Sequence, residues 1–100
     1  MADKTIVITG ANGGLGRALA RRFASEGETV FLLGRSLEKV QAVADAIGAG
    51  ATAIACDVTS PDSVRQAFAL IAGQAERIDV LINNAAIFQP QLIAEASDEH

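Results

Sequence analysis

Short apolar runs alternate along the chain with longer segments in which apolar residues recur every three or four positions. The runs are continuously apolar, as is typical of strands that are buried on both faces, and they lie at about 6–8, 30–33, 51–56 and 78–82. The segments between them have the periodicity of helices with one apolar face, and they lie at 15–24, 37–47 and 61–72. Strands that alternate with helices of this length predict βαβ units and a parallel sheet.

Several residues mark where the helices begin and which side of each faces the sheet. Ser36 can cap the second helix, and Ser60 followed by Pro61 is a strong start for the third, because proline is favoured at the first helical position. Beyond the fourth strand, a loop with Pro90 precedes Ser97, which resembles the cap of a further helix. The residues expected to pack on the sheet are Leu15, Leu19 and Phe23 in the first helix, Leu37, Val40, Val43 or Ala44 and Ile47 in the second, and Val64, Ala67, Phe68, Ile71 and Ala72 in the third.

The expected fold is an α/β domain, a Rossmann-type doubly wound parallel sheet with the strand order 3-2-1-4. Right-handed crossovers would place the first two helices on one face of this sheet and the third helix on the other. One helix cannot cover a four-stranded face, and the fourth strand would keep an open edge. We therefore expect residues 1–100 to be the amino-terminal portion of a longer single domain, truncated after the fourth strand. Taken alone, this piece is expected to be marginally stable, self-associating, or both.

Composition excludes several classes of protein. The chain of 100 residues has 8 Lys and Arg against 12 Asp and Glu, and its net charge of −4 argues against nucleic acid or an anionic membrane as a partner. No apolar stretch is long enough to span a bilayer. A strand pattern that begins at about Thr5 leaves no room for a targeting peptide, so a cytoplasmic location is expected. The single cysteine, Cys56, excludes an internal disulfide and is expected to be a small core residue.

The chemically unusual residues all follow strands directly. A glycine-rich segment, 10–16, comes after the first strand, and Gly34 and Arg35 come after the second. Asp57 follows the third strand, and Asn83 and its neighbour end the fourth. In an open parallel sheet the carboxyl ends of the strands form one rim, and ligands bind there where the strand order reverses. The sequence therefore predicts a ligand site at this rim.

The glycines after the first strand suit a phosphate-binding turn. Gly10 allows the chain to turn sharply, and Gly13 or Gly14 lets the backbone approach a pyrophosphate closely. Gly16 lets the following helix pack closely on the sheet. The amino terminus of that helix supplies N–H donors and a partial positive charge. The alternative is a glycine-rich turn that serves tight packing alone.

Three motifs resemble one family, the short-chain dehydrogenases/reductases. Residues 9–16, Thr-Gly-Ala-Asn-Gly-Gly-Leu-Gly, are similar to its Thr-Gly-x-x-x-Gly-x-Gly signature. Residues 83–86, Asn-Asn-Ala-Ala, resemble its Asn-Asn-Ala-Gly motif, and Asp57-Val58 resembles its Asp-Val pair after the third strand. Ala86 departs from the family's glycine, and the spacing of the glycines in 10–16 also fits the Gly-x-x-Gly-x-x-Gly pattern of the epimerase-like branch. The Asn-Asn-Ala element favours the dehydrogenase branch.

The resemblance implies a dinucleotide site. The loop 10–16 would hold the pyrophosphate, Asp57 would accept from the adenine amino group, and the Val58 backbone would lie beside the ring. Asn83 would lie against the adenosine ribose and help to tie the central strands together. Without a ligand, Asp57 would be a turn residue before Ser60, and Asn83 would satisfy loop backbone. The full set of predicted cofactor-binding residues includes two that follow the second strand, and no metal ligand is predicted. The set is Gly10, Asn12, Gly13, Gly14, Leu15, Gly16, Arg35, Ser36, Asp57, Val58, Asn83 and Ala85.

The residues after the second strand favour NADP over NAD. An acidic residue at this position would accept from the ribose 2′-hydroxyl and repel a 2′-phosphate, but the chain has Gly34 there. Arg35 offers a charge-assisted contact to a phosphate, and Ser36 offers a hydroxyl. The alternative is that Arg35 is a solvated residue at a helix start. Arg17, Arg21 and Arg22 are expected to form a solvated helix face.

The chain lacks the family's proton-transfer residues. Catalysis in the family uses a Tyr, a Lys four residues later and a Ser, and this chain contains no Tyr. The resemblance implies a homo-oligomeric parent that transfers a hydride between NADP and a carbonyl or alcohol carbon of a small molecule, while these residues alone would be inactive. A non-catalytic NAD(P)-binding sensor or scaffold and an epimerase-like enzyme stay open as alternatives.

Overall fold

The sheet and its helices follow the predicted order. A computed structural model describes residues 4–11 and 13–83. The elements in this part are β1 (Thr5–Thr9), α1 (Gly14–Ser25), β2 (Thr29–Gly34), α2 (Leu37–Ile47), β3 (Ala51–Ala55), α3 (Pro61–Ala72) and β4 (Val80–Asn83). The strands are all parallel and lie in the order β3-β2-β1-β4, which confirms the predicted fold class and strand order.

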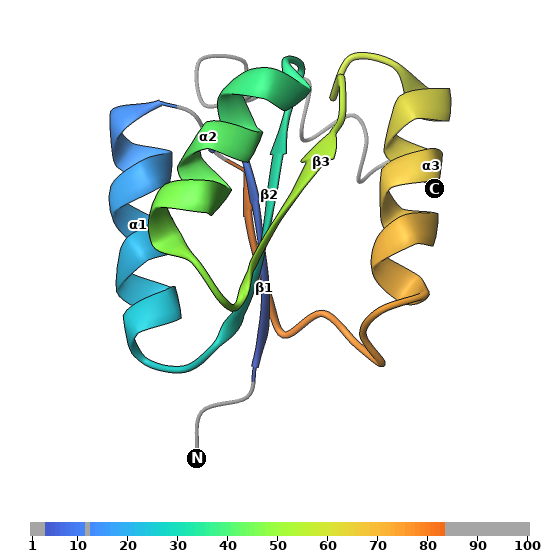
Figure 1. The fold of residues 1–100 in the computed structure, drawn as a ribbon. Coiled ribbons are helices and arrows are strands. Elements are labelled where there is room, and N and C mark those ends of the chain that lie inside the picture. Colours follow the sequence, from blue (N-terminus) through green and yellow to red (C-terminus); the bar gives the residue numbers. More distant parts are fainter. Residues whose placement is uncertain (1–3, 12, 84–100) are drawn as a thin grey trace.

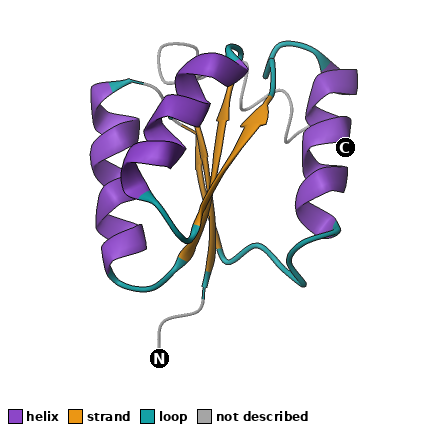
Figure 2. Ribbon diagram, viewed as in Figure 1, coloured by secondary structure: helices purple, strands orange, loops and turns teal. Residues whose placement is uncertain are grey.

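Helices cover both faces of the sheet. Figure 1 and Figure 2 show α1 and α2 on one face and α3 on the other, as right-handed crossovers require. Successive residues of a strand point to opposite faces, so Ile6 and Ile8 belong to the apolar cluster under α1 and α2, whereas Val7 belongs to the cluster under α3. Both faces of β1 are therefore buried, which explains why its sequence is a continuous apolar run.

Side chains cap two of the three described helices as the sequence predicted. The Ser36 hydroxyl oxygen accepts a hydrogen bond from the Lys39 N–H at 3.3 Å, at the start of α2. The Ser60 hydroxyl oxygen accepts from the Ser63 N–H at 3.3 Å, and Pro61 is the first residue of α3. These caps fix where the two helices begin, close to the ends of β2 and β3.

The fourth strand begins two residues later than predicted. The prediction placed it at 78–82, but β4 spans Val80–Asn83 and Ile78 precedes it. The cause is Asp79, whose carboxylate accepts from the Thr5 N–H at 2.8 Å while its own N–H donates to the Thr5 carbonyl at 2.9 Å. The Arg77 Nε forms an ion pair with the Oδ1 of the same carboxylate at 2.9 Å. This clamp at the base of β1 sets the point at which the fourth strand starts.

Three residues predicted to face the sheet do not. Leu15 is 56% exposed and Leu37 is 49% exposed, and both lie in the first turn of their helices. Because Cα–Cβ bonds tilt toward the amino terminus of a helix, side chains in a first turn extend past the carboxyl edge of the sheet. Ala72, the last residue of α3, is also exposed, since the preceding Ile71 faces the core.

The fourth strand is incompletely covered, as expected. Within the described residues β4 pairs only with β1, and Leu81 is the register partner of Val7. Val7 is fully buried under α3, whereas Leu81 is 52% exposed. One helix therefore does not cover this face of the four strands. None of the described helices is long and apolar enough to cross a membrane.

Candidate functional site

The strand ends bring the predicted residues to one edge of the sheet. In the parallel register, Thr9 pairs with Leu33 on one side and with Asn83 on the other, and Gly34 pairs with Ala55. The residues that follow β1, β2 and β3 therefore leave the sheet next to one another, at the top in Figure 1. This edge is called the rim below. Asn12 and Ala85 lie outside the described residues, as do Asn84 and Ala86.

Two glycines of the first turn are required by the fold itself. Gly10 has φ +65°, a left-handed conformation that side chains rarely adopt. A Cβ at Gly16 would lie 2.7 Å from the Gly10 carbonyl oxygen and 2.8 Å from the Ala11 Cα. The Ala11 N–H donates to the Leu33 carbonyl at 3.2 Å, which anchors the turn to the end of β2. Gly16 thus permits close packing, as predicted, although it packs against the turn rather than the sheet.

The other two glycines are not required in this way. Gly13 has an extended backbone with φ −79°, and a Cβ there would be 3.6 Å from the Gly10 carbonyl oxygen, an ordinary contact. A Cβ at Gly14 would have no atom within 4 Å. The backbone at 13–14 is therefore open to an approaching group.

The amino terminus of α1 differs from those of α2 and α3. It has no side-chain cap and no acidic residue in its first turn, whereas the first turns of α2 and α3 hold Glu38 and Asp62 in addition to their serine caps. The first intrahelical bond comes from the Arg17 N–H to the Gly13 carbonyl at 2.9 Å. Among the described residues no acceptor faces the N–H groups of residues 14–16. These donors and the positive end of the helix dipole favour an anion at this point.

Arg35 and Ser36 lie at the rim between β2 and α2. Arg35 is exposed and follows Gly34, the last residue of β2. Ser36 caps α2 by accepting a hydrogen bond, so its hydroxyl hydrogen is available to donate to an oxygen acceptor. Together they offer a guanidinium and a hydroxyl donor at the same corner.

Asp57 closes a turn and keeps its charge. Its Oδ1 accepts from the Thr59 N–H at 3.0 Å and from the Thr59 hydroxyl at 2.6 Å, so the turn role foreseen for this residue is present. The side-chain bond from Thr59 is the main reason that the pKa of Asp57 lies below its ordinary value, followed by the backbone bond and a smaller effect of Arg35. Its Oδ2 has no partner among the described residues. One carboxylate oxygen therefore builds the turn and the other can accept from a ligand.

Asn83 ties β4 to β1 through a residue that the sequence analysis missed. The Thr9 hydroxyl donates to the Asn83 Oδ1 at 3.0 Å, and the same hydroxyl lies 3.5 Å from the Ile82 carbonyl. Thr9 is buried at the end of β1, directly after the apolar run Ile6–Ile8. A buried hydroxyl next to a glycine turn is a signal that a partner is needed. The predicted link between the central strands is confirmed, although its partner is a side chain and not loop backbone.

Val58 and Cys56 complete the end of β3. Val58 is partly buried against the cluster under α3, beside the Asp57 turn. Cys56 is 3% exposed in the same cluster, and burial raises the pKa of its thiol despite a hydrogen bond with Ser63. It is a core residue, as predicted. Within residues 4–11 and 13–83, no group of His, Cys, Asp and Glu is arranged to hold a metal ion.

Comparison with known proteins identifies relatives along almost the whole chain. The family described as short chain dehydrogenase matches residues 4–100. The chain is 42% identical over 83 residues to a serine 3-dehydrogenase of Agrobacterium fabrum, a match that covers 83% of this chain and 33% of that protein. The chain thus spans about a third of the length of this relative.

Two solved structures with the same arrangement contain a nicotinamide cofactor. A 3-ketoacyl-(acyl-carrier-protein) reductase from Brucella melitensis, complexed with NADH, matches with a TM-score of 0.75 and 33% identity, over 78% of this chain and 32% of that one. An actinorhodin polyketide ketoreductase with NADPH matches with a TM-score of 0.77 and 30% identity, over 83% of this chain and 34% of that one.

Proposed function

The chain belongs to the short-chain dehydrogenase family, and we propose that it is the cofactor-binding part of an oxidoreductase that transfers a hydride between NADP and a carbonyl or alcohol carbon. Residues 1–100 would form the amino-terminal portion of a single Rossmann domain. The relatives named above are dehydrogenases and reductases, which favours this reaction over a binding-only or epimerase-like role.

The observation that supports this proposal is the uncapped start of α1. Three N–H donors at 14–16 face no acceptor among the described residues, no carboxylate lies in the first turn, and the space beside Gly14 is open. A pyrophosphate supplies the missing acceptors and the negative charge that this helix end favours. Asp57 and Asn83 lie at the same rim, where the Asp57 Oδ2 and the Asn83 side chain would contact the adenosine part.

The residues present indicate which parts of the reaction the chain performs and which the cofactor performs. The bound nicotinamide supplies the hydride chemistry. The residues of the rim bind and orient the dinucleotide, and the turn at 10–16 holds its phosphates on backbone amides. Transfer of a proton to or from the substrate oxygen needs a group such as Tyr, and the chain contains none. We therefore assign the Ser, Tyr and Lys of the family to the remainder of the protein.

The preference for NADP rests on this chain's own residues, because the structural relatives include one with NADH and one with NADPH. Gly34 stands where an acid would repel a 2′-phosphate. Arg35 and the hydroxyl hydrogen of Ser36 lie beside it. This corner is suited to a phosphate dianion, and Gly34 offers no carboxylate to a free ribose hydroxyl.

A fluorescence titration of the intact protein with NADPH and NADH tests the proposal. Arg35→Asp should weaken NADPH binding by at least about tenfold, since it replaces attraction by repulsion, and should change NADH binding far less. Arg65→Asp, on the exposed side of α3, is the control and should leave both titrations unchanged. Equal loss of both cofactors in Arg35→Asp would remove the NADP assignment. Failure of the wild-type protein to bind either cofactor at millimolar concentration would remove the proposed function.

We further propose that the whole protein is cytoplasmic and homo-oligomeric. Cys56, the only cysteine of residues 1–100, is buried and free, which suits a reducing compartment. Fractionation of cells and sedimentation of the intact protein test these two points.

A further inference from the structure

A groove between α1 and α2 contains three cationic side chains and no anionic one. Its volume is about 280 Å³. It is lined by Arg17, Arg21, Lys39, Ala42, Val43 and Ala46. This set is called the basic groove below. The groove was not foreseen from the sequence, which predicted a solvated face for the arginines of α1.

The cations of the basic groove are not neutralised by neighbouring carboxylates. The chain has 8 Lys and Arg. Three of them, Arg22, Arg65 and Arg77, have a carboxylate partner. In the described part of the chain no ion pair involves Arg17, Arg21, Arg35, Lys39 or Lys4. Four of these five lie in the basic groove or at the rim beside it. On a chain with a net charge of −4, such a concentration of positive charge outside ion pairs favours an anion.

Two of the three groove cations lie directly behind the rim. The Arg17 N–H bonds to the Gly13 carbonyl at 2.9 Å, and the Lys39 N–H bonds to the Ser36 hydroxyl oxygen at 3.3 Å. Both residues are therefore in the first turns of helices that begin at the rim, and their Cα–Cβ bonds tilt toward it. Because Arg17 and Lys39 line the same groove, the Arg17 side chain lies on the side of α1 that faces α2.

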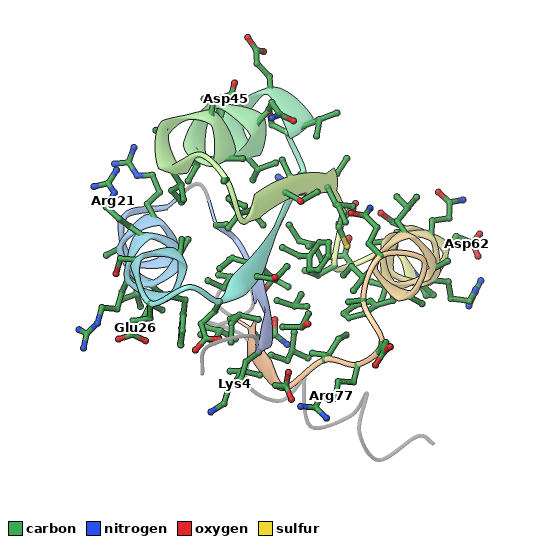
Figure 3. The ribbon with its side chains drawn as sticks, turned by 60° about the horizontal axis from the view of Figure 1, so that its bottom comes forward. Lys4, Arg21, Glu26, Asp45, Asp62 and Arg77 are labelled. Carbon is green, nitrogen blue, oxygen red and sulfur yellow. The ribbon has the colours of Figure 1, made fainter. Side chains whose placement is uncertain are left out.

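The third cation, Arg21, lies farther from the rim, so it tests whether the effect of a charge depends on its distance from the bound anion. Arg21 follows Arg17 by one turn, about 6 Å along the helix axis. Figure 3 shows Arg21 on the side of α1 next to α2, whereas Asp45 lies on the outer side of α2. An anion at the rim should therefore sense Arg17 and Lys39 more strongly than Arg21.

We propose that Arg17 and Lys39 are further specificity-determining residues, which act with Arg35 to attract the 2′-phosphate of NADP. This inference rests on the proposed function. The pyrophosphate is common to NAD and NADP and is assigned to the amides of α1, but only NADP places a phosphate at the corner of Ser36. The preference for NADP is then shared among three cations from β2, α1 and α2.

The test uses ligands that differ only in the 2′-phosphate. Adenosine 2′,5′-bisphosphate and adenosine 5′-monophosphate are titrated into the intact protein by calorimetry at 0.1 M and 1 M salt. Arg17→Gln and Lys39→Gln should each weaken bisphosphate binding about threefold, and the double variant about tenfold, as expected for exposed charge interactions. Binding of the monophosphate should change less than about twofold, and the differences should shrink at 1 M salt because the charges are screened.

Two matched variants give the controls. Arg22→Gln removes an exposed arginine of α1 that is paired with Glu26 at 2.9 Å, and it should leave both ligands unaffected. Arg21→Gln should have a smaller effect than Arg17→Gln. Far-ultraviolet circular dichroism confirms that each variant is folded.

Three results would contradict the inference. They are a double variant that binds the bisphosphate as tightly as wild type, equal weakening of both ligands, and an Arg21→Gln effect as large as that of Arg17→Gln. In each case the proposed function is still supported if the wild-type protein binds the bisphosphate. A wild-type protein that binds neither ligand refutes the proposed function itself.

Discussion

Replacing Gly13 by aspartate should stabilise the fold and weaken cofactor binding at the same time. Gly13 is the N-cap of α1, with φ −79° and ψ 167°, a conformation that aspartate adopts readily at this position. A Cβ there meets only the Gly10 carbonyl oxygen at 3.6 Å. The side chain can therefore be added without strain, and its carboxylate can accept from the open N–H groups of the first turn.

The gain in stability has three sources. Loss of glycine freedom in the unfolded chain contributes about 0.4–1 kcal/mol. Exchange of a glycine cap for aspartate adds a few tenths of a kcal/mol, and a negative charge at the helix amino terminus adds about 0.3–1 kcal/mol. The free energy of unfolding should rise by about 1–2 kcal/mol in total.

The loss of binding arises because the carboxylate takes the place of the phosphate. Two like charges 4 Å apart repel by about 1 kcal/mol in water and by about 4 kcal/mol at an effective dielectric of 20. The dissociation constant should therefore rise by a factor of about five to a thousand, for NADP and NAD alike.

Gly13→Asn separates the cap from the charge. Asparagine caps a helix as well as aspartate does, so it should stabilise the fold by a similar amount while weakening binding much less. Urea denaturation measures the stability, and titration with NADPH measures the binding. If the aspartate variant bound the cofactor as tightly as wild type, the phosphates would not lie on this turn. If it were less stable than wild type, the start of α1 would not be short of acceptors.

Two other changes test the geometry of the rim. Gly16→Ala should lower the free energy of unfolding, measured by urea denaturation, by about 1–3 kcal/mol, because its Cβ would lie 2.7 Å from the Gly10 carbonyl oxygen. Gly14→Ala, whose Cβ would have no atom within 4 Å, should raise it by about 0.4–1 kcal/mol. Similar values for both variants would show that the turn can relax. Thr59→Val should raise the pKa of Asp57 toward its ordinary value, since the largest cause of its lowering is removed, and a carboxyl carbon NMR titration that finds no change would contradict this. Because the folded pKa is lowered, the carboxylate stabilises the protein above about pH 4 and this contribution is lost as the pH falls through the folded value.

The order of elements was predictable because each signal is local. A continuous apolar run such as 6–8 has no polar face to expose, so it belongs to a strand covered on both sides, and the structure buries Ile6, Val7 and Ile8 completely. The serine caps of α2 and α3 depend only on residues within one turn. The strand order then follows from the handedness of the crossovers.

The features that sequence analysis missed depend on contacts between distant residues. The start of β4 is set by Asp79 and Thr5, which lie 74 positions apart in the chain. The Thr9–Asn83 bond also joins residues 74 positions apart. The basic groove needs two helices to lie side by side, with Arg17 on one and Lys39 on the other. None of these leaves a periodic pattern along the chain.

The four glycines of residues 10–16 fall into two pairs that differ in their structural environment. Gly10 and Gly16 are fixed by the chain itself, through a positive φ and a contact too close for any Cβ. Packing gives no such reason for Gly13 and Gly14, because a side chain would fit at both. Glycine at these two positions leaves the backbone open to an approaching group, and the donors exposed there are suited to phosphate. This difference between the two pairs, rather than the number of glycines, is the strongest argument for a dinucleotide at the rim.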